Sequence, residues 1–85
     1  MEIVLAPQAI EDLQFWNKSG KKIIQKRIQA LLASIQETPF EGIGKPEALK
    51  HNLSGKWSRR ITSEHRLLYV VNNNDVTILT LRFHY

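Results

Sequence analysis

The hydrophobic pattern divides the chain into a helical first half and a strand-rich second half. A short apolar run at 3–5 predicts a strand, and Pro7 follows it, a residue that the first turn of a helix tolerates well. Apolar residues then recur at helical spacing up to Ser19-Gly20, where a glycine is typical of a helix end. A second helix is predicted from about 21 to 36, because one apolar stripe follows the 3.6-residue period. This stripe consists of Ile24, Ile28, Leu31, Leu32 and Ile35.

The second half reads as a loop followed by strands. Residues 38–46 include two prolines and two glycines, which indicates a loop, and after it the hydrophobic period shifts towards two. We therefore predict an α+β fold of order β-α-α-β-β-β-β, with two N-terminal helices packed on one face of a mostly antiparallel five-stranded sheet. A chain of 85 residues has room for one core, so we expect a single domain over 1–85. The four later strands are predicted at 47–53, 57–63, 65–72 and 76–84.

The last two strands decide which polar side chains share a face. We expect Leu81 to meet the helices, with Arg82 and His84 on the uncovered side. A three-residue turn at 73–75 pairs Arg66 with Arg82 and brings Arg66 to the face of His84, whereas a two-residue turn pairs Arg66 with Leu81. We predict the three-residue turn. The two faces of the last strand would then be Thr77, Leu79, Leu81 and Phe83 on the helix side, and Val76, Ile78, Thr80, Arg82 and His84 on the other.

Composition excludes several classes of protein. Without cysteine the chain has no disulfide, thiol nucleophile or thiolate metal site, and its three histidines lack metal-ligand spacing. We therefore expect neither a metal nor a cofactor. No run approaches the roughly 20 apolar residues of a membrane span, and the acidic, proline-interrupted N-terminus is unlike a signal peptide. We expect a soluble cytoplasmic protein with no membrane partner.

The positive charge is concentrated in one segment. Residues 45–66 hold six lysines and arginines against two glutamates, an excess equal to the net charge of +4 of the whole chain. Such a cluster is typical of phosphate recognition, because each cation bound to a phosphate releases a condensed counterion. A well-solvated surface hairpin explains the same charges, and the charge pattern alone leaves both interpretations open.

Within this segment and at the chain end lies a set of groups suited to cutting RNA. RNA carries its own nucleophile, the 2′-OH, so a base, a cation for the charge that develops on phosphorus and an acid for the leaving 5′-oxygen suffice. Glu47, Arg66 and His84 fit these roles in that order. Because neighbouring cations weaken a carboxylate as a base, we expect a low rate for the free protein and dependence on a larger assembly. Simpler explanations remain: a terminal histidine without a function, and an Arg66 that only pairs with a nearby acid.

The sequence resembles a known family of toxins. The run TPFEGIGKPEALKHNLSGKWSRRITSEHRLLY at 38–69 and the closing RFHY at 82–85 are similar to the YoeB/Txe family of the RelE/ParE toxin–antitoxin superfamily. The resemblance implies a RelE-like fold and an mRNA interferase that enters the A site of the 70S ribosome and cuts mRNA there without a metal. It also implies a YefM-type antitoxin as partner, and a homodimer among the forms the toxin takes.

The resemblance also assigns residue roles. Glu47 matches the family's general base, Arg66 its phosphate-stabilising arginine and His84 its general acid. Two other functions remain as alternatives: a ParE-like toxin that poisons DNA gyrase, whose members typically lack this set of three, and a basic nucleic-acid-binding module without catalysis. The residues expected to contact RNA or the ribosome, or to shape the site beside them, are Lys50, Arg59, Arg60, Arg82 and Tyr85.

Overall fold

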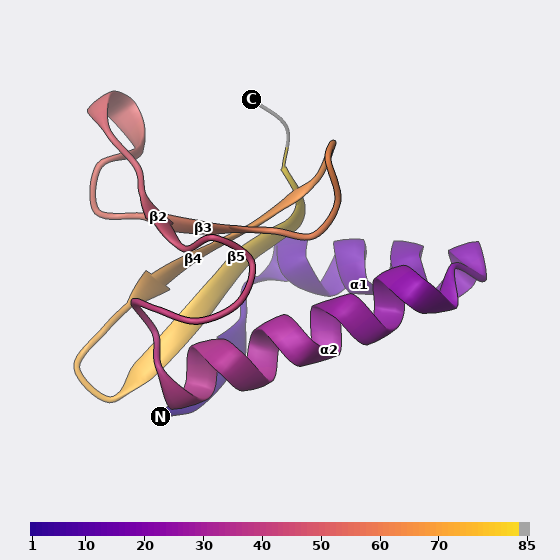
Figure 1. Ribbon diagram of the computed structural model, residues 1–85, viewed down its shortest axis with the longest axis horizontal. Coiled ribbons are helices and arrows are strands. Elements are labelled where there is room, and N and C mark those ends of the chain that lie inside the picture. The colour runs from indigo at the N-terminus through magenta and orange to yellow at the C-terminus, as the bar shows by residue number, and fades with distance from the viewer. Residues whose placement is uncertain (84–85) are drawn as a thin grey trace.

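In the computed structural model, which describes residues 1–83, two helices cover one face of a five-stranded sheet (Figure 1). The elements are β1 (Glu2–Leu5), α1 (Pro7–Ser19), α2 (Lys22–Glu37), β2 (Glu47–Ala48), the 3₁₀ helix η1 (His51–Leu53), β3 (Trp57–Arg60), β4 (Arg66–Val71) and β5 (Asp75–Phe83). The strand order is β1-β5-β4-β3-β2, with β1 parallel to β5 and the other neighbours antiparallel. The predicted α+β fold class is confirmed, and β5 lies inside the sheet between β1 and β4.

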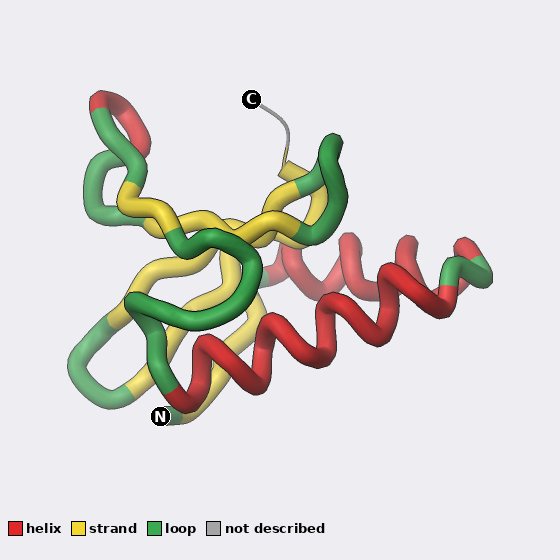
Figure 2. The backbone as a smooth tube through the Cα atoms, viewed as in Figure 1, coloured by secondary structure: helices red, strands yellow, loops and turns green. Residues whose placement is uncertain are grey.

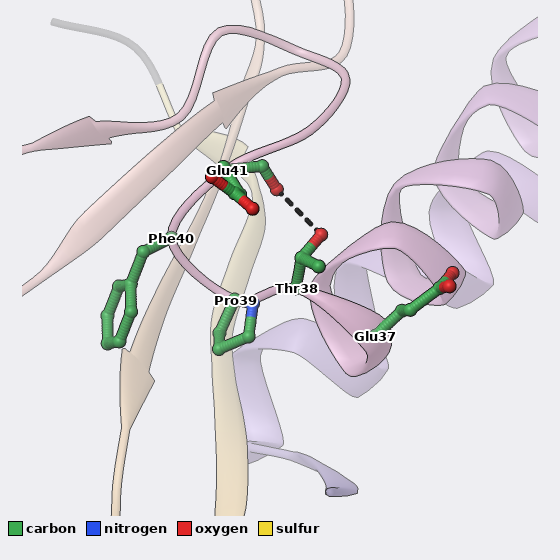
Figure 3. Close-up of a pocket in the computed structure, with 5 residues that line it drawn as sticks. All are labelled: Glu37, Thr38, Pro39, Phe40 and Glu41. Carbon is green, nitrogen blue, oxygen red and sulfur yellow. Dashed lines mark hydrogen bonds between the residues drawn. The ribbon is translucent and has the colours of Figure 1, made fainter.

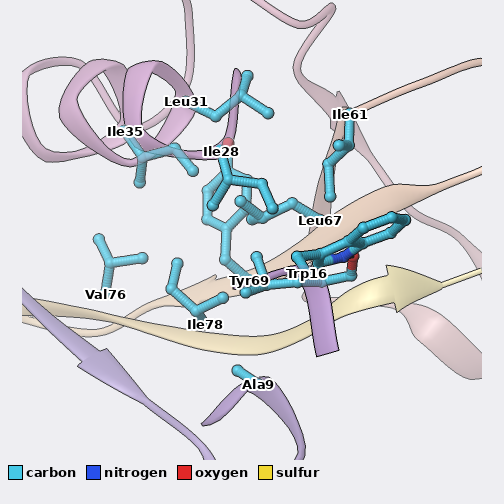
Figure 4. Packing of buried hydrophobic residues seen from close by; sticks show 11 residues of the cluster. Ala9, Trp16, Ile28, Leu31, Ile35, Ile61, Leu67, Tyr69, Val76 and Ile78 are labelled. Atoms are coloured by element: carbon cyan, nitrogen blue, oxygen red, sulfur yellow. The ribbon is translucent and has the colours of Figure 1, made fainter. Parts of the chain in front are cut away.

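The core forms between the helices and the sheet, as the apolar stripe predicted. Ile28, Leu31 and Ile35 of α2 are buried, and the other two residues of the stripe are partly buried against the same cluster. Burying each such side chain contributes about 1.5–3 kcal/mol, so this stripe is a main source of the free energy of folding. Figure 4 shows how these side chains meet those of the sheet and α1. The other members of the buried cluster are Ala9, Trp16, Ile61, Leu67, Tyr69, Val76, Ile78 and Leu81.

Two predicted strands are shorter in the structure. The predicted strand 47–53 pairs with β3 only as Glu47–Ala48, and the chain then turns through η1, so that part of the prediction is wrong. His51 has a left-handed φ of 59°, which ends extended pairing. The segment joining β2 to β3 rises from the sheet on the side away from the helices (Figure 2). The predicted strand 57–63 ends at Arg60, because the carbonyl of His65 accepts the N–H groups of both residues 61 and 62 and closes a turn.

The turn between β4 and β5 differs from the prediction. Asn72 donates its N–H to the carbonyl of Asp75 at 2.8 Å, which leaves a two-residue turn and not the expected three-residue turn. Two register shifts then follow between Arg66 and Tyr69, so that Arg66 lies opposite Phe83. The predicted pairing of Arg66 with Arg82 is therefore wrong, because β-bulges add residues that simple alternation does not count.

The same shifts change which face of β5 is buried. Val76 and Ile78, predicted to face away from the helices, lie fully buried in the core. Beyond the register shifts, Leu81 is the residue that points towards the helices, and it is buried as predicted. The interval from 78 to 81 is three residues, an odd step, so the predicted faces of this strand are correct at Thr80 and Leu81. The prediction is wrong for Phe83, which lies opposite Arg66 and so shares its uncovered face.

Two side chains of α1 hold the backbone of β5 where β1 has already ended. The Asp12 carboxylate accepts the Leu81 N–H at 2.9 Å and the Thr80 hydroxyl at 2.7 Å, and Asp12 is only 2% exposed. The Trp16 indole N–H donates to the Leu81 carbonyl at 2.9 Å. Asp12 and Trp16 lie four residues apart on one face of α1 and together satisfy the backbone N–H and carbonyl of Leu81. The pairing of β1 with β5 ends three residues earlier, at Ile78.

Asp12→Asn is expected to reduce the free energy of unfolding by about 1–3 kcal/mol near neutral pH, because an amide is a poorer acceptor for these buried donors. Burial raises the pKa of the Asp12 carboxyl, but hydrogen bonds from Thr80, Leu81 and Gln8 and the charge of Arg82 outweigh it, so the pKa lies below its ordinary 3.8. A lowered pKa gives stability that is complete above the unfolded-state value and lost as pH falls through the folded value.

Urea unfolding of both proteins across pH tests this expectation. The gap between wild type and Asp12→Asn should be constant near neutral pH and shrink below about pH 4. Glu11→Gln, an exposed neighbour on α1, is the matched control and should change the free energy of unfolding by less than about 0.5 kcal/mol. A gap as wide in strong acid as at neutral pH would contradict the role given to the Asp12 charge.

Candidate active site

The face of the sheet away from the helices brings Glu47 and Arg66 together. Glu47 lies opposite Ser58, and Ser58 lies opposite Leu68 on the next strand. Paired residues of antiparallel strands share a face, as do residues two apart on one strand, so Arg66 lies on this face with them. Their separation on the sheet is two strands across and two residues along. Glu47 is exposed and Arg66 half-buried.

The position between them is polar and enclosed. Ser58 is fully buried, and its hydroxyl has no hydrogen-bond partner among residues 1–83. Leu68 beside it is 3% exposed, although α1 and α2 both cover the opposite side of the sheet. A depression lined by Glu47, Ala48, Leu49 and Lys50 lies along β2 and the two residues after it. The face therefore carries a carboxylate and a guanidinium, with an unsatisfied hydroxyl on the strand between them.

Two of the predicted RNA-contacting cations lie at the surface near this face. Lys50 and Arg60 are both exposed, and Arg60 lies opposite Arg66 in the β3–β4 register. Arg60 and Arg66 are like charges placed side by side, an arrangement that disfavours the isolated fold but favours a bound polyanion.

Arg82 is exposed, and its guanidinium carbon lies 3.6 Å from the ring centroid of Phe15 on α1. Such a cation–π contact directs the side chain towards the helix. The prediction that Arg82 lies opposite Arg66 is wrong, as described above, and the structure associates Arg82 with α1.

Arg59 differs from the prediction most. It is fully buried, and its guanidinium donates hydrogen bonds to side chains and carbonyls inside the fold. The expectation that Arg59 faces RNA is therefore wrong: alternation along β3 turns Arg59 towards the helices and its neighbour Arg60 away from them. Tyr69 is a core residue beside Arg59, and burial raises the pKa of its hydroxyl while the Arg59 hydrogen bond opposes that rise.

The other predicted site residues, His84 and Tyr85, lie outside the described residues. Trp57 is half-buried, with its ring 4.9 Å from that of the exposed Phe40.

Within residues 1–83, no group of three His, Asp or Glu side chains is placed to hold a metal ion. Over the same range, neither helix is long and apolar enough to span a bilayer.

Comparison with known proteins identifies the class to which this fold and site belong. A family model described as "YoeB-like toxin of bacterial type II toxin-antitoxin system" matches residues 5–85. Toxin YoeB of Escherichia coli K12 is 47% identical over 85 residues, covering all of both chains. The structure of a YoeB/ParE toxin from Agrobacterium tumefaciens superimposes with a TM-score of 0.93 at 38% identity, covering all of both chains.

A third relative has been solved in two assemblies. YoeB of Staphylococcus aureus is 45% identical, with 100% of this chain and 98% of that chain covered. Its structures as a dimer and as a YoeB–YefM complex match with TM-scores of 0.88 and 0.86. The chain is thus a toxin of the small α+β type, and it belongs to the YoeB family of type II toxin–antitoxin systems. The resemblance seen in the sequence is confirmed.

Proposed function

We propose that this toxin is a ribosome-dependent endoribonuclease that cuts mRNA in the ribosomal A site. The observation that carries the proposal is the strand register, which puts Glu47 and Arg66 on the same uncovered face of the sheet. Membership of the YoeB family supports it, together with exposed cations beside that face. Action on ribosomes implies that the toxin works in the cytoplasm.

The reaction uses the 2′-OH of the message as nucleophile. Glu47 takes the 2′-OH proton, the 2′-oxygen attacks the adjacent phosphorus, and the bond from phosphorus to the 5′-oxygen breaks. Arg66 stabilises the negative charge that develops on the phosphoryl oxygens. His84, assigned from the sequence alone, protonates the leaving 5′-oxygen. The products are a 2′,3′-cyclic phosphate and a free 5′-hydroxyl.

The proposal includes an antitoxin. By analogy with the YoeB–YefM complex of Staphylococcus aureus, the chain binds a YefM-type antitoxin, and by analogy with the dimer it also self-associates. An acidic, partly disordered segment complements the exposed cations of 45–66, which are Lys45, Lys50 and Arg60. Binding over that face would cover Glu47 and Arg66 and so stop cleavage.

Induction of the chain in cells tests the proposal. We expect new 5′ ends inside translated messages, mapped by primer extension, and none in the same messages when their start codon is removed. Co-expression of the cognate antitoxin should abolish the cuts. DNA breaks without message cleavage would instead show a gyrase-poisoning toxin, and neither kind of damage would show a binding module, so either result contradicts the proposal.

A further inference from the structure

The buried Arg59 side chain donates hydrogen bonds to several residues of the loop at 38–44. Its Nε donates to the Tyr69 hydroxyl at 3.2 Å, and one terminal nitrogen donates to the Ser34 hydroxyl at 2.7 Å and the Ile43 carbonyl at 3.1 Å. The other donates to the carbonyls of Thr38 at 2.7 Å and Glu41 at 2.8 Å. All five donors of the guanidinium are therefore matched by acceptors.

These acceptors belong to the segment that leads from α2 to β2. Three of them are backbone carbonyls of residues 38–43, and the Tyr69 hydroxyl donates to a fourth, that of Pro39, at 2.7 Å. The Thr38 hydroxyl closes the first turn by donating to the Glu41 carbonyl at 3.0 Å, as Figure 3 shows. The loop thus wraps around Arg59 with its carbonyls directed inward.

The loop approaches so closely that two positions require glycine. A Cβ at Gly42 would clash with the Ser34 hydroxyl oxygen and lie 3.2 Å from the Arg59 guanidinium. A Cβ at Gly44 would lie 2.6 Å from Leu31 and 3.2 Å from the Arg59 Cβ. Both glycines have a positive φ, of 118° and 84°, which other residues rarely adopt. The sequence of the loop is therefore fitted to the arginine at its centre.

The loop leads into Glu47 through Lys45 and Pro46. The Gly44 carbonyl accepts the Arg60 N–H at 2.7 Å, three residues before Glu47. β2 itself is a two-residue strand at the edge of the sheet, paired on one side with β3. So short a strand fixes the position of its side chains weakly, and the loop before it supplies the missing constraint.

We propose that Arg59 is a positioning residue for Glu47: by fixing loop 38–44 it sets the place of the general base on the sheet. This inference rests on the proposed function, in which Glu47 takes the 2′-OH proton. A planar guanidinium is required because its fork reaches carbonyls on both sides of the loop, whereas a lysine ammonium at this position has three donors on a single atom. The carbonyls after the C-terminal end of α2 also offset the buried positive charge.

The test is the Arg59→Lys variant in single-turnover cleavage of mRNA on saturating 70S ribosomes. We expect the cleavage rate to fall about 10- to 100-fold, the effect of displacing a catalytic group by about 1 Å. Ribosome affinity, measured by co-sedimentation, should change less than about twofold, since Arg59 does not reach the surface. Arg27→Lys is the matched control, because Arg27 donates to the Arg60 carbonyl outside this loop, and it should cut at the wild-type rate.

A double-mutant cycle separates positioning from general damage. If Arg59 acts through Glu47, then Arg59→Lys should lower the rate of wild type but not that of Glu47→Gln. A wild-type rate for Arg59→Lys, or an equal loss in both backgrounds, overturns the inference. If Glu47→Gln itself cuts at the wild-type rate, the proposed function fails in its choice of base and this inference fails with it. The single variants therefore distinguish the two failures.

Tyr69→Phe extends the test if Arg59→Lys does not fold. It removes one hydroxyl that joins Arg59 to Pro39 and leaves the other four Arg59 hydrogen bonds in place. We expect a smaller fall in the cleavage rate, about threefold, with unchanged ribosome affinity and again no effect in the Glu47→Gln background. A Tyr69→Phe protein that is folded by circular dichroism and loses ribosome affinity instead of rate contradicts the inference.

Discussion

Glu47→Gln is expected to slow cleavage of ribosome-bound mRNA by about 10²- to 10⁴-fold, the usual contribution of a general base. Glutamine keeps the shape of glutamate and its place opposite Ser58, but it takes up no proton. The loss should appear in the single-turnover rate at saturating ribosomes, with ribosome affinity nearly unchanged, because the carboxylate acts in the transition state. His84→Gln should give a loss of similar size by removing the acid.

The control for Glu47→Gln is Glu64→Gln, an exposed acid in the turn between β3 and β4. It removes the same charge from the same basic segment without touching the shared face of Glu47 and Arg66. We expect the wild-type rate from it. Full activity in both Glu47→Gln and His84→Gln would end the proposed mechanism, whatever the affinity of the variants for ribosomes.

Arg66→Lys should reduce the cleavage rate by about 10²- to 10³-fold, comparable to the loss of one preorganised donor to a developing oxyanion. Lysine keeps the positive charge, so the ground-state attraction to phosphate persists. It lacks the planar fork with which, in the proposed mechanism, arginine contacts two phosphoryl oxygens at once in the transition state. Arg66→Gln removes the charge as well and should lower the rate further.

The readout for Arg66→Lys is again the single-turnover rate, set beside the affinity for ribosomes. The expected pattern is a large fall in rate with an affinity within a few-fold of wild type. An affinity that falls as much as the rate would assign Arg66 to binding alone. Thermal unfolding of the variant checks that it is still folded, because Arg66 begins β4 and is half-buried.

The helices were predictable because their apolar period is long and regular, as the stripe from Ile24 to Ile35 shows. The residue of β5 that lies opposite Arg66 could not be predicted in the same way. It depends on a two-residue turn and two register shifts, and the alternation of apolar residues does not reveal either. Glu47 and Arg66 still share a face, through the regular β2–β3 and β3–β4 pairings. The hydrophobic pattern alone does not specify which residues of β2, β3 and β4 lie opposite one another.

Arg59 was misjudged for a different reason, and the burial of Asp12 was not predicted: charged residues are usually exposed, and these two are buried with hydrogen-bond partners. The sequence did contain signals. Adjacent arginines on one strand point to opposite faces, so Arg59 and Arg60 could not both reach RNA from β3. Asp12 stands four residues before Trp16, which places it on the apolar side of α1. What no pattern reveals is the set of acceptors and donors that meets each side chain.

The interior place of β5 has a consequence for how the toxin is made. β5 lies between β1 and β4, and its Leu81 is hydrogen-bonded to Asp12 and Trp16 of α1. The residues of β5 are nevertheless synthesised after those of β1, α1 and β4. The sheet therefore lacks the strand that joins β1 to β4, and the buried cluster lacks Val76, Ile78 and Leu81, until residues 75–83 have left the ribosome that makes them. Contacts that span nearly the whole chain are also slow to form, because the entropy of closing a long loop opposes them. The translating ribosome thus holds an incomplete fold, and a working toxin arises only after its own synthesis has passed β5.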